Sequence, residues 1–320
     1  MSDGVSILEL MSEDTYHIPV LLHEAVEGLA IRPDGVYVDA TLGGGGHSQA
    51  IVERLSPEGH LYGIDQDSDA IAHAFADTRF TAVHGNFRFL ANFMRFYGVL
   101  GKVDGILADL GVSSHHFDEA DRGFSFRADA PLDMRMNRSA AVSAADLIAD
   151  ASEERLADIF KLYGELRQAR ALARAIVKAR GEAPVDTTGR LAAVAEKVLS
   201  PASVKKEMAQ VFQALRIEVN GEMDALGMFL EASLKTLRPG GRIAVITYHS
   251  LEDRLVKNFF RSGRLDGKIE SDIFGRTSVP LKALGNKPIT PTAEEEATNP
   301  RSRSAKLRIA VKNQSSDSLQ

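Results

Sequence analysis

Four consecutive glycines stand in the segment Asp39-Ala-Thr-Leu-Gly-Gly-Gly-Gly-His-Ser48, directly after an apolar run, Val36–Ala40, that reads as a buried strand. Consecutive glycines let the backbone turn sharply and approach a ligand within contact distance. A helix that starts after them presents unpaired N–H groups to the same ligand. We therefore expect the glycines of this loop, Gly44 included, to lie against a nucleotide-like molecule. A plain tight turn, with the acids capping helices, is the alternative.

Polar and aromatic residues follow the next expected strands in the same way. Asp65 comes 26 residues after Asp39 and ends the second apolar run, where an acid is placed to accept hydrogen bonds from ribose hydroxyls. Phe87 follows the third run and is placed to lie along an adenine, and Asp109 ends the fourth. A nicotinamide-dependent oxidoreductase is the main rival. Its G-x-G-x-x-G loop binds a pyrophosphate, and the loop here is one residue too compact for the third glycine, so an adenosine without a pyrophosphate suits it better.

Short apolar runs alternate with helical patterns along the chain, which is typical of βαβ units and a parallel sheet. The expected strands are Val36–Ala40, Leu61–Asp65, Phe80–His84, Val103–Leu110, Arg242–Tyr248 and Ala305–Val311. About 130 residues separate the fourth strand from the fifth, which is too many for a loop in a compact domain. We predict an α/β fold with a Rossmann-like, doubly wound sheet and an inserted helical domain.

The expected division of the chain follows from these patterns. The helical insertion spans 127–208 and separates a first part of the sheet domain, 1–126, from a second part, 209–313. The chain re-enters the sheet domain through a helix that contains Phe212–Met223. The polar residues 314–320 are expected to be a disordered tail.

Composition limits the possible classes of protein. Hydrophobic residues make up 44% of the chain and charged residues 26%, which allows a sizeable core and argues against disorder. No apolar stretch approaches the ~20 residues of a membrane span, and no basic start precedes an apolar run, so we expect a cytoplasmic, unprocessed protein. The net charge of −6 argues weakly against a nucleic-acid partner, but a phosphate backbone meets local basic stripes rather than the average.

Cysteine is absent, which excludes disulfides, thiolate metal sites and a cysteine nucleophile. His115 and His116 are adjacent, so their side chains point apart, and no spaced partner completes a ligand set. We predict no metal site.

Several longer segments carry a resemblance to a known family. They are His17-Ile-Pro-Val-Leu-Leu22, Asp39–Ser48, Asp104-Gly-Ile-Leu-Ala-Asp-Leu-Gly-Val-Ser-Ser114, Arg122-Gly-Phe-Ser-Phe126, Pro131-Leu-Asp-Met-Arg-Met136, Phe212-Gln-Ala-Leu-Arg-Ile217, Tyr248-His-Ser-Leu-Glu-Asp-Arg254 and Asn299-Pro-Arg-Ser-Arg-Ser304. Along nearly its whole length the chain resembles the MraW-type ribosomal RNA methyltransferases. The resemblance implies a methyltransferase sheet interrupted by an RNA-recognition insertion, with S-adenosyl-L-methionine as the cofactor. It also implies methylation of the N4 amine of a cytidine in 16S ribosomal RNA.

Carried over by position, the family's cofactor contacts fall on Gly45, Gly46, His47, Asp65, Phe87, Asp109 and His116. This chain departs from the family's pattern in two places. His116 stands where the family usually has Gln, although an imidazole can also donate or accept a hydrogen bond. Lys205-Lys-Glu-Met-Ala209 replaces a basic stretch before Phe212, which bears on RNA contacts or helix capping.

Methyl transfer from a sulfonium is an in-line displacement, so the protein's main task is to align the reacting atoms. Methylation at cytosine C5 needs a cysteine adduct, which this chain cannot form. An exocyclic amine attacks directly when acceptors take its developing positive charge. Asp109 either orients that amine or, as the family's pattern favours, holds the cofactor's charged amino end. His249 is the second catalytic candidate, and a packed, hydrogen-bonded histidine at a strand end is an equal alternative.

Three groups of residues suit RNA. Arg122, Phe124 and Phe126 alternate charge with rings, which fits stacking an extruded base and gripping its phosphates, although a packed loop is the alternative. Further cations share one predicted helix face or a C-terminal patch: Arg167, Arg170, Arg174 and Lys178, then Arg301 and Arg303. The expected partner is 16S ribosomal RNA within the small ribosomal subunit, and the oligomeric state stays open. Besides the oxidoreductase, a non-catalytic RNA-binding protein with a vestigial cofactor fold is the remaining rival.

Overall fold

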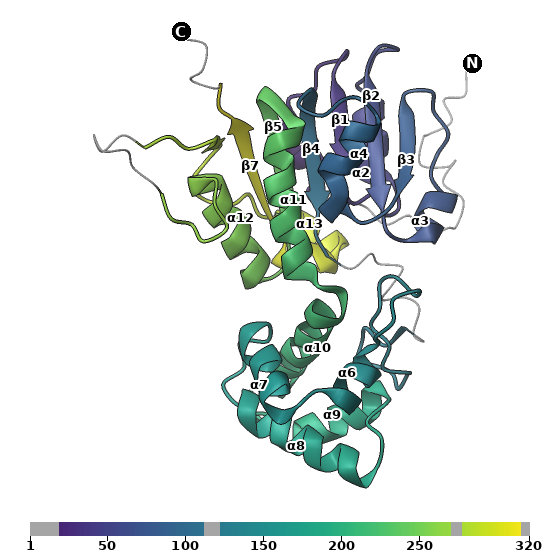
Figure 1. The fold of residues 1–320 in the computed structure, drawn as a ribbon, viewed down its shortest axis with the longest axis vertical. Helices are drawn as coiled ribbons and strands as arrows, with labels where there is room; N and C mark the ends of the chain where they lie inside the picture. Colours follow the sequence, from purple (N-terminus) through teal and green to yellow (C-terminus); the bar gives the residue numbers. More distant parts are fainter. Residues whose placement is uncertain (1–18, 112–121, 270–276, 315–320) are drawn as a thin grey trace, which may run out of the picture.

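The computed structural model describes residues 19–111, 122–269 and 277–314. In this part of the chain seven strands form one sheet in the order β3-β2-β1-β4-β5-β7-β6 (Figure 1). The strands are β1 (Val36–Asp39), β2 (His60–Asp65), β3 (Phe80–His84), β4 (Val103–Asp109), β5 (Leu237–Thr247), β6 (Leu281–Ala283) and β7 (Lys306–Lys312). The first five pair in parallel, and β7 runs antiparallel to both β5 and β6. The predicted Rossmann-like α/β class is confirmed.

The strand order reverses at β1, which lies between β2 and β4. In doubly wound sheets ligands bind beyond the carboxyl ends of the strands at this point. Helices cover both faces of the sheet. One face packs with α1 (Leu22–Leu29) and α2 (Gly46–Val52), and the other with α4 (Leu90–Phe96), α11 (Glu222–Thr236) and α12 (Ser250–Ser262).

The alternation of side chains along each strand produces these two layers. In β4, Ile106 belongs to the core formed with Phe229 of α11, whereas the next residue, Leu107, belongs to the core formed with Ile51 of α2. Because both faces are covered, the central strands are apolar almost throughout. Shorter elements complete the sheet-bearing part: α3 (Ser68–Ala72), η2 (Phe87–Phe89), α13 (Ala293–Thr298) and η4 (Pro300–Ser304).

A second group of helices lies below the sheet in Figure 1 and has a hydrophobic core of its own. It consists of α6 (Ala144–Asp150), α7 (Glu153–Leu162), α8 (Ala169–Glu182), α9 (Thr188–Glu196) and α10 (Val204–Asn220). Side-chain caps begin three of them: Ser143, Ser152 and Thr187 accept hydrogen bonds from the amides of Asp146, Arg155 and Arg190. No helix in the described part of the chain has the length and apolar character needed to cross a membrane.

One sequence-based expectation about the elements was wrong, and one strand was not expected. The helix expected to contain Phe212–Met223 is broken at Gly221, whose φ of 57° ends α10 and begins α11 in a new direction. The short edge strand β6 was not predicted, because three residues with one buried side chain give no alternation to detect. The expected boundary at 208/209 falls inside α10. Of the expected tail, 314–320, only residue 314 belongs to the described part of the chain.

Candidate active site

The tetraglycine loop joins β1 to α2 at the switch point of the sheet. Gly43 and Gly45 have φ values of 49° and 79°, which lie in the left-handed region that is unfavourable for residues with a Cβ. Gly46 lies so close to Pro19 that a Cβ there would come 2.3 Å from the Pro19 Cγ. Gly44 differs from these three, because a Cβ at this position would meet no protein atom within 4 Å. The loop therefore presents one glycine to open space and uses the others for turning and packing.

Two buried or half-buried carboxylates hold this loop in shape. Asp39 accepts hydrogen bonds from the Ser48 hydroxyl at 2.8 Å and the Thr41 amide at 3.1 Å, and burial raises its pKa to about 6. Asp65 accepts from the Gly43 amide at 2.8 Å, and burial raises its pKa as well. Asp65 is only half-buried and keeps lone pairs for a ligand, whereas Asp39 is wholly enclosed and serves the loop.

His47 and Asp109 face each other across the carboxyl ends of β1 and β4. The His47 Nδ1 lies 3.9 Å from the Asp109 Oδ2, and its Nε2 lies 3.1 Å from the Val20 carbonyl oxygen. Burial lowers the pKa of His47, so the imidazole is neutral near pH 7. Of the two side chains only Asp109 retains an accessible portion, with 24% of its side chain exposed. Asp109 is thus the group that can meet a ligand.

Tyr248 contacts Asp109 and was not among the predicted site residues. Its hydroxyl donates to the Asp109 Oδ1 at 2.8 Å, and its ring covers Gly111, where a Cβ would lie 3.0 Å away. Burial raises the pKa of Asp109 to about 7, and the hydrogen bond from Tyr248 opposes that rise. The carboxyl group therefore titrates close to neutral pH. Only the position of Tyr248 at the end of an expected strand could have indicated its role.

His249 caps α12 and is held by Glu252. The Glu252 amide donates to the His249 Nδ1 at 3.4 Å, and the His249 Nε2 lies 3.0 Å from the Glu252 Oε1. Glu252 also accepts from the Tyr248 amide at 2.9 Å. The contact at Nδ1 matches the packed, hydrogen-bonded interpretation of His249, but the buried Nε2 has no hydrogen-bond partner among the described residues despite that distance. The catalytic role of His249 stays a prediction.

One trio of possible metal ligands occurs among the described residues: Glu222, His249 and Glu252 offer ligand atoms within 4.8 Å of one another. Arg216 already holds the Glu222 carboxylate through two hydrogen bonds of 2.8 and 2.9 Å. With a guanidinium in this position, the trio has the character of an internal ion-pair network.

The predicted adenine contact, Phe87, begins η2 and packs edge-on against Phe229, with ring centroids 5.3 Å apart. Next to it, the Asn86 amide donates to the Gln66 Oε1 at 2.7 Å, and the Gln66 Nε2 lies 3.4 Å from the Met136 sulfur. Met136 comes from the segment that leads into the helical part. Gln66 and Met136 are therefore neighbours of the adenine position that the sequence did not reveal.

With this geometry in place, the chain can be compared with known proteins. The profile of the MraW methylase family matches residues 14–313. The chain belongs to the MraW methylase family. A ribosomal RNA small subunit methyltransferase H from Parabacteroides distasonis is 59% identical over 300 residues, which cover 94% of this chain and 98% of the relative. The protein of the same name from Flavobacterium johnsoniae is 54% identical over 297 residues, covering 93% and 98%.

A crystal structure of a putative rRNA-methylase from Clostridium thermocellum aligns with 92% of this chain and 99% of its own, at 12% identity and a TM-score of 0.41. At that score the match adds nothing to the topology described above. Membership of the MraW methylase family confirms the resemblance drawn from the sequence motifs and makes the chain a methylase.

The remaining predicted residues of this MraW-family chain differ in their surroundings, and one of them lies outside the described part of the chain. His116, the residue that departs from the family's usual Gln, lies outside the described residues. Arg122 and Phe124 are buried, and Arg122 donates to the carbonyl oxygens of Arg135 and Met136 at 2.8 and 3.0 Å. The half-buried Phe126 packs against the ring of Phe212 in α10, with ring centroids 5.4 Å apart. The packed-loop interpretation accounts for the two buried side chains, and RNA contact by this group stays a prediction.

Apart from the buried Arg122, the predicted basic residues are all exposed. Arg170, Arg174 and Lys178 project from α8, and Arg167 lies in the turn before it. Arg174 pairs with Glu153 at 3.3 Å. Arg301 and Arg303 are exposed in η4. The structure thus brings the helical cations together and leaves the C-terminal pair on a separate element.

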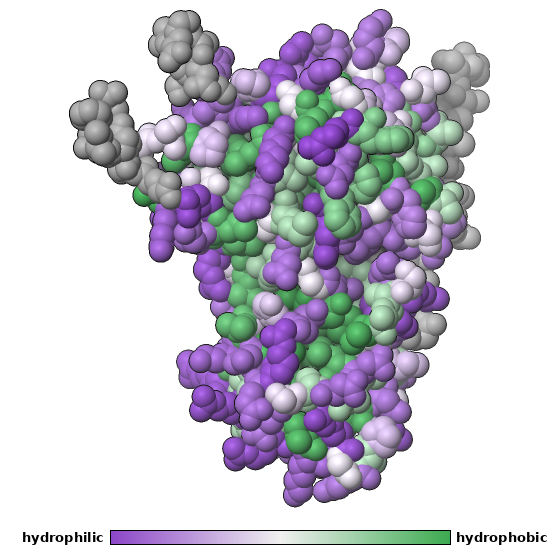
Figure 2. All heavy atoms as spheres, in the orientation of Figure 1, coloured by the Kyte–Doolittle hydropathy of each residue, from purple (hydrophilic) through white to green (hydrophobic). Residues whose placement is uncertain are grey.

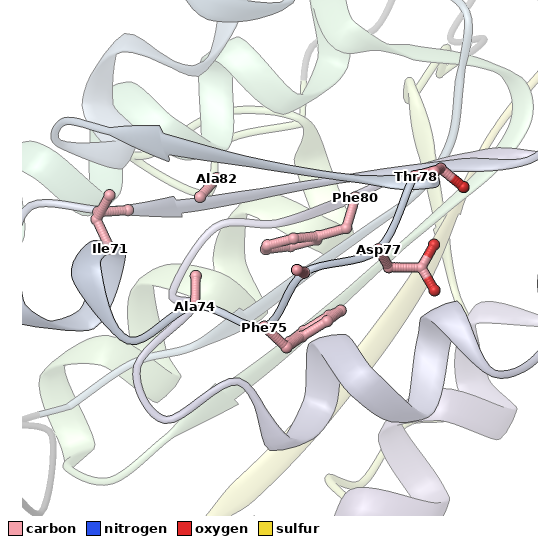
Figure 3. Close-up of a pocket in the computed structure, with 8 residues that line it drawn as sticks. Ile71, Ala74, Phe75, Asp77, Thr78, Phe80 and Ala82 are labelled. Carbon is pink, nitrogen blue, oxygen red and sulfur yellow. The ribbon is translucent and has the colours of Figure 1, made fainter.

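A hollow of about 510 Å³ lies between α3 and the beginning of β3 (Figure 3). The stacked rings of Phe75 and Phe80, 4.4 Å apart, line it, and none of the predicted cofactor residues does. Phe75 packs on the loop, since a Cβ at Gly45 would lie 3.6 Å from its ring. Phe75, stacked on Phe80, therefore packs against the glycine loop at Gly45.

Proposed function

We propose that this chain transfers a methyl group from S-adenosyl-L-methionine to the exocyclic N4 amine of a cytidine in 16S ribosomal RNA. One observation supports the proposal most strongly. Asp65 ends β2 and Asp109 ends β4, the two strands on either side of β1, and the glycine loop that follows β1 is open above Gly44. Membership of the MraW methylase family supports the reaction, and the small-subunit relatives support the substrate.

The residues present fit such a cofactor. Open space above Gly44 leaves room for a ligand against the loop, and the half-buried Asp65 has lone pairs for ribose hydroxyls. Phe87 offers a ring edge beside the adenine position. When bound, S-adenosyl-L-methionine supplies an electrophilic methyl group on a sulfonium. We assign the remaining contacts to the backbone N–H groups of Gly45 and His47, since the His47 side chain is buried, with Gly46 and His116 as further candidates.

Asp109 and Tyr248 give the pocket its chemistry. As a carboxylate, Asp109 accepts a hydrogen bond from an ammonium or a developing cationic amine, and Tyr248 fixes the direction of its free oxygen. The same arrangement therefore serves either role of Asp109, holding the cofactor's amino end or orienting the cytidine amine. His249 remains the second candidate for contact with the base.

The helical part, 127–208, is proposed as the RNA-recognition unit because it carries the exposed cations. Arg167, Arg170 and Arg174 meet phosphates, and Arg301 and Arg303 add a second basic contact. The substrate proposed is the ribosomal RNA within the small subunit, in the cytoplasm.

Calorimetry tests the cofactor half of this proposal. S-adenosyl-L-methionine should bind the wild-type chain, and Asp65→Ala should weaken binding about tenfold or more by removing ribose acceptors. Asp69→Ala is the matched control, since this acid lies four residues on and is exposed. Tight binding of NADH with no binding of S-adenosyl-L-methionine would favour the oxidoreductase instead.

A further inference from the structure

Two exposed phenylalanine rings stand at the two ends of α4 and serve no part of the proposed site: Phe89 ends η2 directly before this helix, and Phe96 is its last residue. Phe96 is 84% exposed and Phe89 is 45% exposed. They are seven residues apart, which places them on one side of the helix at roughly 10 Å spacing. Met228 of α11, the helix that packs along α4, is 46% exposed as well. A single exposed ring is ordinary, but a row of them is typical of a binding surface.

Two arginines flank these rings with the same spacing. Arg88 donates to the Asn86 Oδ1 at 3.3 Å and Arg95 donates to the Asn92 Oδ1 at 3.4 Å. Within the described part of the chain neither arginine forms an ion pair, whereas arginines elsewhere, such as Arg79, are paired with carboxylates. The row therefore carries uncompensated positive charge in a chain whose net charge is −6.

Exposed acids also lie on α11, the helix that packs along α4. Asp224 and Glu231 are exposed on that helix together with Lys235. No carboxylate of α11 comes within 4.0 Å of either flanking arginine. The positive charge thus remains available to an anion from outside.

The row begins at the candidate site. Phe87, the predicted adenine contact, is the first residue of η2, and Arg88 follows it. Arg88 also reaches the junction of α10 and α11, since a Cβ at Gly221 would lie 3.6 Å from its Nη2. Figure 1 shows α4 and α11 side by side above that junction, and Figure 2 shows polar and apolar side chains intermixed over the same face.

We propose that Phe89 and Phe96, with Arg88 and Arg95, form a track for a single-stranded segment of the RNA that flanks the target nucleotide. Rings accept any base by stacking, and arginines contact the phosphates between them. Charge complementarity favours RNA over an apolar protein partner, because two unpaired cations flank the rings. The inference rests on the proposed function for its substrate, but it is measured by binding alone.

The chain contains no tryptophan, which permits a direct test. Phe96→Trp places a single indole in the track, and Leu284→Trp places a matched one beside β6, at the opposite edge of the sheet from β3. An unstructured 12-nucleotide RNA should quench the indole at position 96 and leave the one at position 284 unchanged. Arg88→Gln with Arg95→Gln should lower the log–log salt slope of RNA binding by about 1.4, at about 0.7 per phosphate.

Binding of the RNA, seen by anisotropy, without quenching at position 96 would overturn the track. So would quenching by assembled small subunits but not by free RNA, which would assign the surface to a ribosomal protein. Methyl transfer is assayed in parallel with the same variants. Quenching of the indole at position 96 without methylation of any RNA would contradict only the proposed function. Methylation without quenching of that indole would contradict only the track.

Discussion

The Tyr248 hydroxyl lies 2.8 Å from the Asp109 Oδ1, although the two residues are 139 positions apart in the chain. They meet because β4 and β5 pair in parallel and end at the same edge of the sheet. One oxygen of Asp109 is thereby occupied, and the other faces His47, which is neutral. The carboxyl group is held in one orientation by a neutral donor rather than by a cation.

Replacing Tyr248 with Phe should change how methylation depends on pH. Burial raises the pKa of Asp109 to about 7, and the hydrogen bond from Tyr248 lowers it, so removal of the hydroxyl raises it further. Because the charged carboxylate is the useful form, the acid limb of kcat/KM should move up by about one pH unit. Tyr97→Phe is the control. An acid limb that stays in place would contradict the role given to Tyr248.

Asp109→Asn should remove activity but stabilise the fold at neutral pH. The folded pKa is raised, so the wild-type chain loses stability as pH rises from about 4 to about 7, and no more above that. The variant lacks this loss. Because the pKa of this carboxyl rises from 3.8 to about 7 on folding, the free energy of unfolding of the variant should exceed that of the wild type by up to about 4 kcal/mol at pH 8, and by much less at pH 4. Urea unfolding at both pH values measures the difference, and a gain that is equal at the two pH values would refute the linkage.

Two glycines of the loop should respond in opposite ways. Gly44→Ala should leave thermal stability unchanged and weaken S-adenosyl-L-methionine binding about tenfold, because its methyl group enters open space beside the loop. Gly45→Ala should instead cost about 1–2 kcal/mol of stability, since φ is 79° there. Thermal melts and calorimetry on the pair distinguish the two. Full cofactor affinity in Gly44→Ala would place the ligand elsewhere.

Neutralising the helical cations should affect RNA and not the cofactor. Arg167→Gln, Arg170→Gln and Arg174→Gln together should raise the KM for RNA and flatten the dependence of affinity on salt. The matched control neutralises three exposed lysines on other elements: Lys257, Lys282 and Lys287. Both variants lower the net charge equally. Wild-type salt dependence in the arginine variant would show that the α8 cations are only a solvated face.

Much of the sheet could be predicted from the sequence because its central strands are short apolar runs that end in acids. The glycine loop, Asp65 and Asp109 were found in this way, since a turn of this kind needs glycine and the acids directly follow buried strands. The family's motifs added the reaction, which local patterns cannot supply.

Contacts between distant segments could not be predicted. Tyr248 reaches Asp109 and Met136 reaches Gln66 only after the sheet and the segment from the helical part are placed together. Gly221 was read as part of a continuous helix, because an isolated glycine is tolerated there and only its left-handed φ reveals the break. The burial of Arg122 could not be predicted from the sequence either, since a charged residue is normally exposed.

The position of the transferred methyl group tests the central claim most directly. Small-subunit ribosomal RNA that has not been modified is incubated with the chain and methyl-labelled S-adenosyl-L-methionine, then digested to nucleosides for mass spectrometry. We expect label on the N4 amine of cytidine, lost with Asp109→Asn. Label on cytosine C5, or on no nucleoside although the cofactor binds, would contradict the proposed methyl transfer.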